Sequence, residues 1–106
     1  MTNGIVSILK DGKVILKAVA GCNGYPAADV AKAVRKSPGL SVPMLYAICR
    51  ECDFGCEDCL VVQDVQTHKF AGDDELGPLY KAEFSNPRFN PRWVKGTAEY
   101  TEIVEL

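Results

Sequence analysis

The chain has 106 residues, of which 47% are hydrophobic and 25% are charged, and its net charge at pH 7 is −2. This length suits a single domain with a core of its own, spanning residues 1–106. The slightly negative charge gives no electrostatic footprint for nucleic acid or for an anionic membrane, so nucleic-acid binding is disfavoured. No apolar run approaches the roughly 20 residues of a membrane span, and the N-terminus lacks the pattern of a signal peptide. We therefore expect a cytoplasmic domain in a reducing compartment.

Two β-rich runs open the chain, at residues 4–9 and 13–20. Asp11-Gly12 lies between them, and glycine tolerates the positive φ that a two-residue type I′ turn demands. Both runs are apolar at most positions. This pattern predicts a hairpin in the middle of a sheet rather than at its edge.

Two amphipathic helices are predicted next. The first begins at Pro26 and ends before residues 37–39, and the second begins near Pro43. Phe54-Gly55 would end the second helix, with the glycine in the left-handed position. The apolar faces at helical spacing consist of Ala27, Val30, Ala31 and Val34, and of Leu45, Ile48, Cys49 and Cys52.

The stretch 57–69 fits two interpretations. The composition of residues 59–62 favours a strand, whereas an acidic first turn and the shared face of three valines favour a third helix, which we prefer. Further strands are predicted at 79–84 and 97–106. The order of elements predicts an α+β domain: an antiparallel sheet of about four strands, formed by the N-terminal hairpin and two C-terminal strands, with two or three helices packed on one face.

Four of the five cysteines form two C-x-x-C pairs within eleven residues: Cys49, Cys52, Cys56 and Cys59. Four thiolates can hold one structural zinc ion in a tetrahedron. A continuous helix would separate the outer two by about 15 Å along its axis, so the break at Phe54-Gly55 would have to fold one pair back onto the other. The alternatives are buried thiols that line a helix corner, with no cofactor, or a redox or iron–sulfur role. In a reducing compartment, disulfides are not expected.

A thiol-dependent enzyme is the main alternative to a binding protein. It would use Cys22, with His68 as a base, or the C-x-x-C thiols, because a thiol needs a neighbouring base to become nucleophilic. His68 is the only histidine, and nothing in the sequence brings it near Cys22. No P-loop, serine-hydrolase, zinc-protease or dinucleotide motif is present.

Two stretches are candidates for ligand binding. One is the turn at 23–26, with Asn23 and Tyr25, and the other is the tandem repeat at 86–93. In the repeat, the guanidinium groups of Arg88 and Arg92 could bind phosphate or carboxylate, while Trp93 could stack on a planar ligand. In the alternative interpretation, the aromatic residues anchor the loop to the core and the arginines pair with acidic residues 73–75.

The hairpin, the turn Gly24-Tyr25-Pro26 and the first helix together resemble a group of small phage and bacterial proteins with no assigned activity. In that group a hairpin is followed by a D-G-Y-P turn and a helix, and a short strand that contains tyrosine ends the chain. Here Asn23 replaces the aspartate, and residues 99–102 of the predicted last strand are Glu-Tyr-Thr-Glu. The resemblance covers about a third of the chain. It implies no activity, and it would place a phage-encoded protein in the host cytoplasm.

From the sequence we predict a small non-enzymatic protein that binds a protein partner or a small anionic ligand. The prediction depends on the basic-aromatic repeat and on the lack of a recognisable catalytic constellation.

Overall fold

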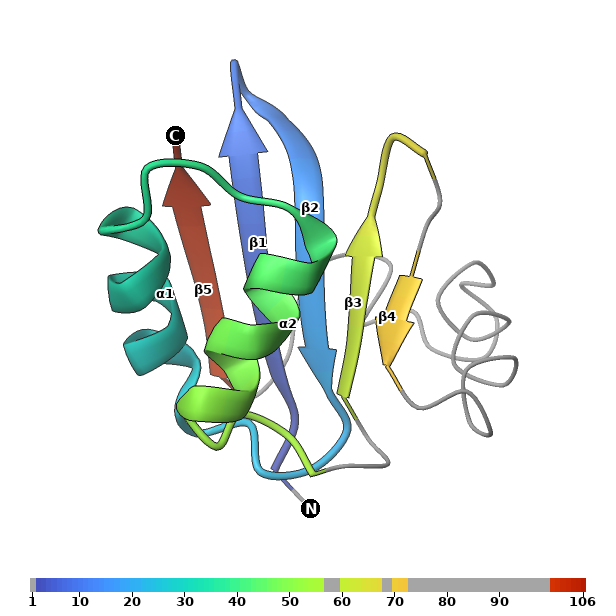
Figure 1. Ribbon diagram of the computed structural model, residues 1–106. Helices are drawn as coiled ribbons and strands as arrows, with labels where there is room; N and C mark the ends of the chain where they lie inside the picture. The colour runs from blue at the N-terminus through green and yellow to red at the C-terminus, as the bar shows by residue number, and fades with distance from the viewer. Residues whose placement is uncertain (1, 57–59, 68–69, 73–99) are drawn as a thin grey trace.

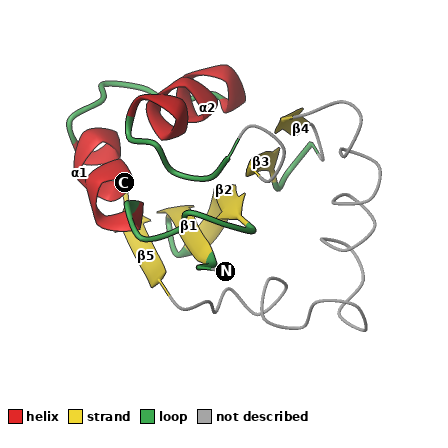
Figure 2. Cartoon of the chain, turned by 90° about the horizontal axis from the view of Figure 1, so that it is seen from below, coloured by secondary structure: helices red, strands yellow, loops and turns green. Residues whose placement is uncertain are grey.

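The computed structural model describes residues 2–56, 60–67, 70–72 and 100–106. Within these ranges the strands form one five-stranded sheet in the order β4-β3-β2-β1-β5, and two helices lie on one face of it (Figures 1 and 2). This arrangement confirms the predicted α+β fold. Neither helix in the described part of the chain is long and apolar enough to cross a membrane. The elements are β1 (Gly4–Lys10), β2 (Lys13–Ala20), α1 (Ala27–Arg35), α2 (Val42–Glu51), β3 (Leu60–Asp64), β4 (Phe70–Gly72) and β5 (Tyr100–Glu105).

The N-terminal hairpin forms as predicted and occupies the middle of the sheet. Its turn residues Asp11 and Gly12 have φ values of 53° and 78°, as a type I′ turn requires. β2 pairs with β3 on one side and β1 pairs with β5 on the other. The apolar composition of both hairpin strands therefore reflects their central place.

The last strand differs from the prediction in direction. β5 runs parallel to β1, with Gly4 opposite Tyr100 and Ile8 opposite Val104, whereas the other three strand pairs of the described residues are antiparallel. The sheet is therefore mostly antiparallel rather than wholly so. β5 lies at one edge of the sheet and β4 at the other. The strand predicted at 79–84 lies outside the described residues.

The predicted third helix is wrong for residues 60–64, which form β3 instead. Leu60 and Val62 belong to the core cluster beneath the helices, while Val61 and Gln63 are also buried and face the other side of the sheet. A strand that is buried on both faces shows no apolar–polar alternation, so a helical spacing of valines fits it equally well. The β-branched composition was the better signal.

The main core lies between the sheet and the two helices. The predicted apolar face of α1 is completely buried, and on α2 the fully buried residues are Leu45 and Cys49. Ile48 and Cys52 pack against the core from its margin. The helical spacing thus predicted the correct face of each helix.

Across β1, β2 and β3 the opposite face of the sheet is also buried, in two rows of side chains. One row is apolar and the other polar, and burial lowers the pKa of Lys17 in the polar row. The apolar row is Val61, Val19 and Ile5, and the polar row is Gln63, Lys17 and Ser7.

Candidate functional site

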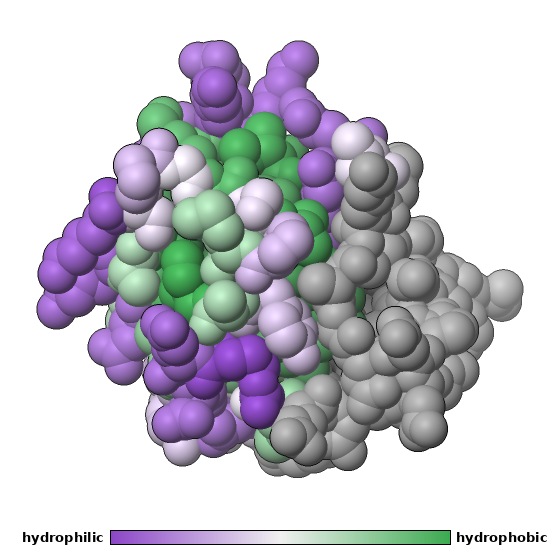
Figure 3. Space-filling model, in the orientation of Figure 1, coloured by the Kyte–Doolittle hydropathy of each residue, from purple (hydrophilic) through white to green (hydrophobic). Residues whose placement is uncertain are grey.

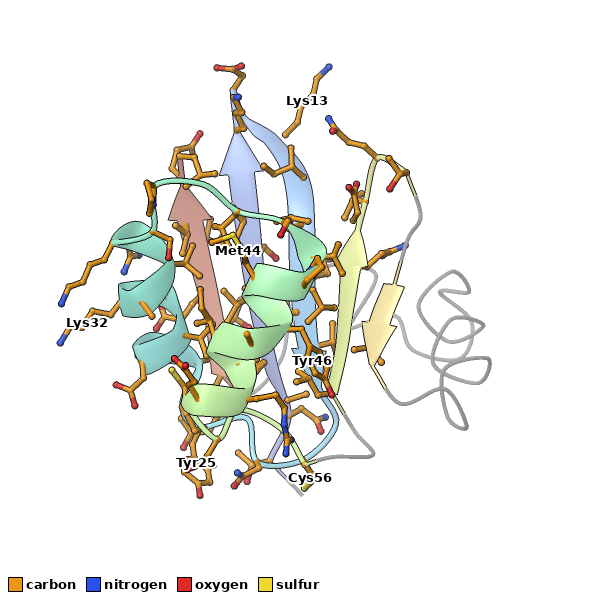
Figure 4. The ribbon with its side chains drawn as sticks, viewed as in Figure 1. Lys13, Tyr25, Lys32, Met44, Tyr46 and Cys56 are labelled. Carbon is orange, nitrogen blue, oxygen red and sulfur yellow. A yellow bond between two sulfur atoms is a disulfide. The ribbon has the colours of Figure 1, made fainter. Side chains whose placement is uncertain are left out.

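Two turns meet at one end of the molecule and bring together residues that are distant in the sequence. The first, residues 21–26, leads from β2 into α1, and the second, residues 52–56, follows the end of α2. We call these two turns the cysteine corner. Tyr25 and Cys56 both lie at this end, opposite the tip of the hairpin that carries Lys13 (Figure 4).

The second turn begins with a hydrogen-bonded C-terminal cap on α2. Phe54 N–H donates to the carbonyl of Cys49 at 2.9 Å and Asp53 N–H donates to that of Arg50 at 3.2 Å, which is the Schellman pattern. Asp53 takes the left-handed conformation with φ 55°. The sequence predicted a glycine there. Gly55 does have a positive φ, of 80°, but it lies two residues further on, after the buried Phe54.

A disulfide between Cys22 and Cys56 joins the two turns, with 6.3 Å between the Cα atoms. It closes a loop with a sequence separation of 34, which contains both helices. The expectation that these cysteines form no disulfide is therefore wrong for Cys56. The cysteine spacing grouped Cys56 with the cluster 49–59 and left Cys22 apart from it, but the fold places the turn after β2 beside the end of α2.

Hydrogen bonds centred on Asn23 hold the same two turns together. Its side-chain Nδ2 donates to the main-chain carbonyl of Asp53 at 2.6 Å, and its main-chain carbonyl accepts from Gly55 N–H at 2.9 Å. Asn23 has a φ of 55°, a conformation that asparagine tolerates better than most residues. The structure thus gives Asn23, predicted as a ligand-binding residue, a role in fixing the corner.

Two glycines allow the first turn to lie directly against the start of β1. Gly24 N–H donates to the carbonyl of Thr2 at 2.9 Å. A Cβ on Gly24 would meet the backbone of Gly4, and a Cβ on Gly4 would lie 2.6 Å from Gly24 O and 2.7 Å from a ring carbon of Phe54. The corner is therefore built on a backbone-to-backbone contact that admits no side chain at either position.

The two cysteines that the described residues show as free thiols, Cys49 and Cys52, are not activated. Burial, reinforced by Cys52, raises the pKa of Cys49 to about 12. The pKa of Cys52 is also raised, first by burial and then by the negative charges of Asp29, Glu51 and Asp53. A nucleophilic cysteine requires a shift in the opposite direction. Complete burial agrees with the interpretation of Cys49 as a core thiol.

The zinc prediction required four thiolates on one ion. In the structure Cys56 is bonded to Cys22, Cys49 is buried in the core, and Cys59 lies outside the described residues. Among the residues that the structure describes, no group of three or more His, Cys, Asp or Glu side chains could hold a metal ion. A zinc site on all four cysteines would require reduction of Cys56, and it stays a prediction.

Tyr25 is the large apolar side chain that the corner exposes, with 58% of its surface accessible to solvent. It is followed by Pro26, which is buried and precedes the first turn of α1. The other predicted binding residues, Arg88, Arg92 and Trp93, lie outside the described residues, as does His68.

Sequence reasoning missed two residues that shape the corner, Gly4 and Asp53. A signal for the second was present, since Asn23-Gly24 and Asp53-Phe54-Gly55 each place left-handed-tolerant residues beside a cysteine. Comparison with family models, with curated proteins and with solved structures finds no match to this chain. The resemblance to small phage and bacterial proteins stays a prediction.

Proposed function

We propose that this protein is a non-enzymatic binding protein that presents Tyr25 from the cysteine corner to a protein partner. The observation that carries the proposal is a large, 58% exposed aromatic side chain on a turn that a disulfide and hydrogen bonds fix on both sides. Tyrosine is enriched among the residues that dominate binding energy at interfaces. A turn that is already ordered loses little conformational entropy when it binds.

The repeat with Arg88, Arg92 and Trp93 is a second part of the proposal. Its guanidinium groups suit a carboxylate or phosphate, so it would contact an acidic part of the same partner or a small anionic ligand. These residues lie outside the described part of the chain, and the proposal for them depends on their sequence.

We place the protein in the cytoplasm, where the disulfide between Cys22 and Cys56 is exposed to reduction. The bonds from Asn23 to Asp53 and from Gly55 to Asn23 do not involve sulfur. They support a corner that stays closed after reduction, with lower stability.

A thiol-dependent enzyme finds less support. Cys22 carries no free thiol in the disulfide form, and the raised pKa values of Cys49 and Cys52 leave them protonated at neutral pH. Rapid alkylation of either thiol at pH 7 would favour the enzyme, and slow alkylation that accelerates only at alkaline pH would favour the binding protein.

The proposal is tested by capture of a partner from extracts of cells that produce the protein, followed by affinity measurement with the purified partner. Tyr25→Ala should weaken binding at least about tenfold, the size expected of an anchoring residue. Tyr25→Phe should retain most of the affinity, because it keeps the ring. Met44→Ala removes another exposed apolar side chain, 44% accessible, away from the corner, and serves as the matched control. Equal affinities for the wild type and Tyr25→Ala would contradict the proposal.

A further inference from the structure

The outer edge of β5 carries backbone groups that are directed away from the sheet. Tyr100 N–H donates to the carbonyl of Asn3 at 3.2 Å and Leu106 N–H donates to that of Leu9 at 2.8 Å. In a strand, successive backbone groups point to opposite sides. The N–H and C=O groups of the even-numbered residues therefore face β1, and those of Ile103 and Glu105 face outward. Within the described residues, β5 is the last strand on this side of the sheet.

This edge is also rich in exposed apolar surface. Tyr100 is 41% accessible, Ile103 is 58% accessible and Leu106 is 53% accessible. They account for three of the five large apolar side chains that are exposed in the described residues. Soluble proteins usually protect an edge strand with charge, a bulge or a covering element. Here Glu102 and Glu105 supply charge, but the apolar side chains between and beside them remain open.

Helix α1 lies over β5 and places positive charge beside the open edge (Figures 1 and 2). Its exposed cations are Lys32 and Arg35, followed by Lys36 at the helix end. Lys32 projects outward from the helix in Figure 4, and this side of the molecule is hydrophilic in Figure 3. Arg35 Nη2 donates to the outward carbonyl of Ile103 at 3.4 Å, so its guanidinium lies at the edge itself.

We propose that the outer edge of β5 binds an extended segment of a partner protein in which acidic side chains alternate with apolar ones. The segment would add a strand to the sheet, a mode in which main-chain hydrogen bonds supply affinity and alternate side chains supply specificity. Carboxylates on the helix side would meet Lys32 and Arg35. Apolar side chains on the other side would cover Ile103.

The hydrogen-bonding geometry of the edge accepts such a strand. The carbonyl groups of an antiparallel segment would accept hydrogen bonds from the N–H groups of Ile103 and Glu105. Its own N–H groups would donate to the carbonyls of the same two residues. Arg35 can stay in place, since a carbonyl oxygen has two lone pairs. On the helix side, Glu102 and Asp29 of the first turn of α1 offset part of the positive charge, but Lys32, Arg35 and Lys36 outnumber these two carboxylates. Glu105 projects from the opposite face of the sheet, because successive side chains of a strand alternate and Val104 lies in the core beneath the helices.

A second copy of the chain fits the same edge poorly. Pairing of β5 with β5 of another copy would bring the two α1 helices to the same side of one continuous sheet. Their basic residues Lys32, Arg35 and Lys36 would then face one another, and like charges in close contact oppose association. A lone segment has no helix to place there.

The test uses an acetylated and amidated peptide, Glu-Val-Glu-Ile-Glu-Val, and its counterpart with lysine in place of glutamate. Binding is followed by amide chemical shifts and by hydrogen exchange of the full chain. We expect the acidic peptide to shift and protect the amides of Ile103 and Glu105, and the lysine peptide to bind at least about fivefold more weakly.

Two variants remove the two sources of binding separately. Ile103→Pro deletes an outward N–H and leaves the bonds of the even-numbered residues to β1, so the fold should persist while binding is lost. Arg35→Glu leaves the main chain of the strand unchanged and should lower the affinity for the acidic peptide at least about fivefold. Lys13→Glu changes a cation at the hairpin tip and should alter affinity less than about twofold.

Three outcomes would overturn the inference: no perturbation of β5 by the acidic peptide, equal affinity for the lysine peptide, or self-association of the chain that Ile103→Pro abolishes in sedimentation. The surface differs from the Tyr25 corner, so Tyr25→Ala should bind the acidic peptide as the wild type does. Failure of the peptide test would therefore leave the proposed function of the corner standing.

Discussion

In the cysteine corner, the backbone N–H groups of Gly24 and Gly55 donate to Thr2 and Asn23, which belong to other segments of the chain. At the outer edge of β5, the N–H groups of Ile103 and Glu105 are directed away from the sheet. The corner adds a disulfide and an asparagine side chain to its backbone bonds. At the edge, the carbonyl of Ile103 accepts a long hydrogen bond from Arg35.

The difference separates two ways of presenting a surface. The corner is closed upon itself, so what it offers a partner is the Tyr25 side chain in a fixed position. The edge offers main-chain groups together with apolar side chains, and it can take up a strand. Changes in the corner should therefore alter stability, and changes at the edge should leave stability almost untouched.

The largest effect is expected from Gly24→Ala. Its Cβ would meet the backbone of Gly4, and backbone cannot move aside as a flexible side chain can. We expect a loss of more than about 4 kcal/mol in the free energy of unfolding, measured in urea. Gly39→Ala is the control, because a Cβ there has no atom within 4 Å, and it should change stability by less than about 0.5 kcal/mol. Similar midpoints for the two variants would refute the close contact.

A smaller effect is expected when the disulfide is removed. Cys22→Ser combined with Cys56→Ser should lower the free energy of unfolding by about 2–4 kcal/mol, since the cross-link closes a loop of sequence separation 34. The hydrogen bonds of Asn23 should keep the fold. Cys52→Ser, at a free thiol, is the control. If reductant lowers the melting temperature of the double variant as much as that of the wild type, the disulfide is not the source of the effect.

The buried thiol beneath the corner predicts a loss of stability at alkaline pH. Burial raises the pKa of Cys49 from 9.0 to about 12, so between these values the unfolded thiol ionises while the folded one keeps its proton. Stability is unaffected by this group below pH 9 and falls as pH rises through the window, by about 1.4 kcal/mol per pH unit. Urea unfolding of the wild type and of Cys49→Ala at several pH values isolates this slope. Parallel curves for the two proteins would contradict it.

The smallest effect is expected at the edge. Arg35→Ala removes a long, exposed hydrogen bond of 3.4 Å to Ile103 O. Thermal unfolding should show a change of less than about 0.5 kcal/mol. A much larger loss would mean that Arg35 holds β5 in the sheet, and the edge could not then be regarded as open.

The parts of the fold that the sequence predicts are those with local causes. Asp11-Gly12 specifies its turn through the φ values that the two residues tolerate. The spacing of Val30 and Val34 on α1 specifies the buried face of that helix because helical periodicity is a local property. β3 was missed because Leu60 and Val61 are buried on opposite faces of the sheet, which removes the alternation that identifies a strand.

The parts that could not be predicted depend on contacts between distant segments. The parallel pairing of β5 with β1 follows from the position of the last strand, which no local pattern encodes. The link from Cys22 to Cys56 requires the turn after β2 to meet the end of α2, and cysteine spacing alone suggested a local cluster. Asn23 was predicted to bind a ligand, but in the structure its left-handed conformation and its hydrogen bonds hold the two turns of the corner together.

Native-state hydrogen exchange, measured amide by amide, tests the contrast between corner and edge most directly. We predict strong protection of the Gly24 and Gly55 amides and of the Tyr100 and Val104 amides that face β1, with rapid exchange at Ile103 and Glu105. Fast exchange at Gly24 and Gly55, or uniform protection along β5, would contradict a closed corner and an open edge.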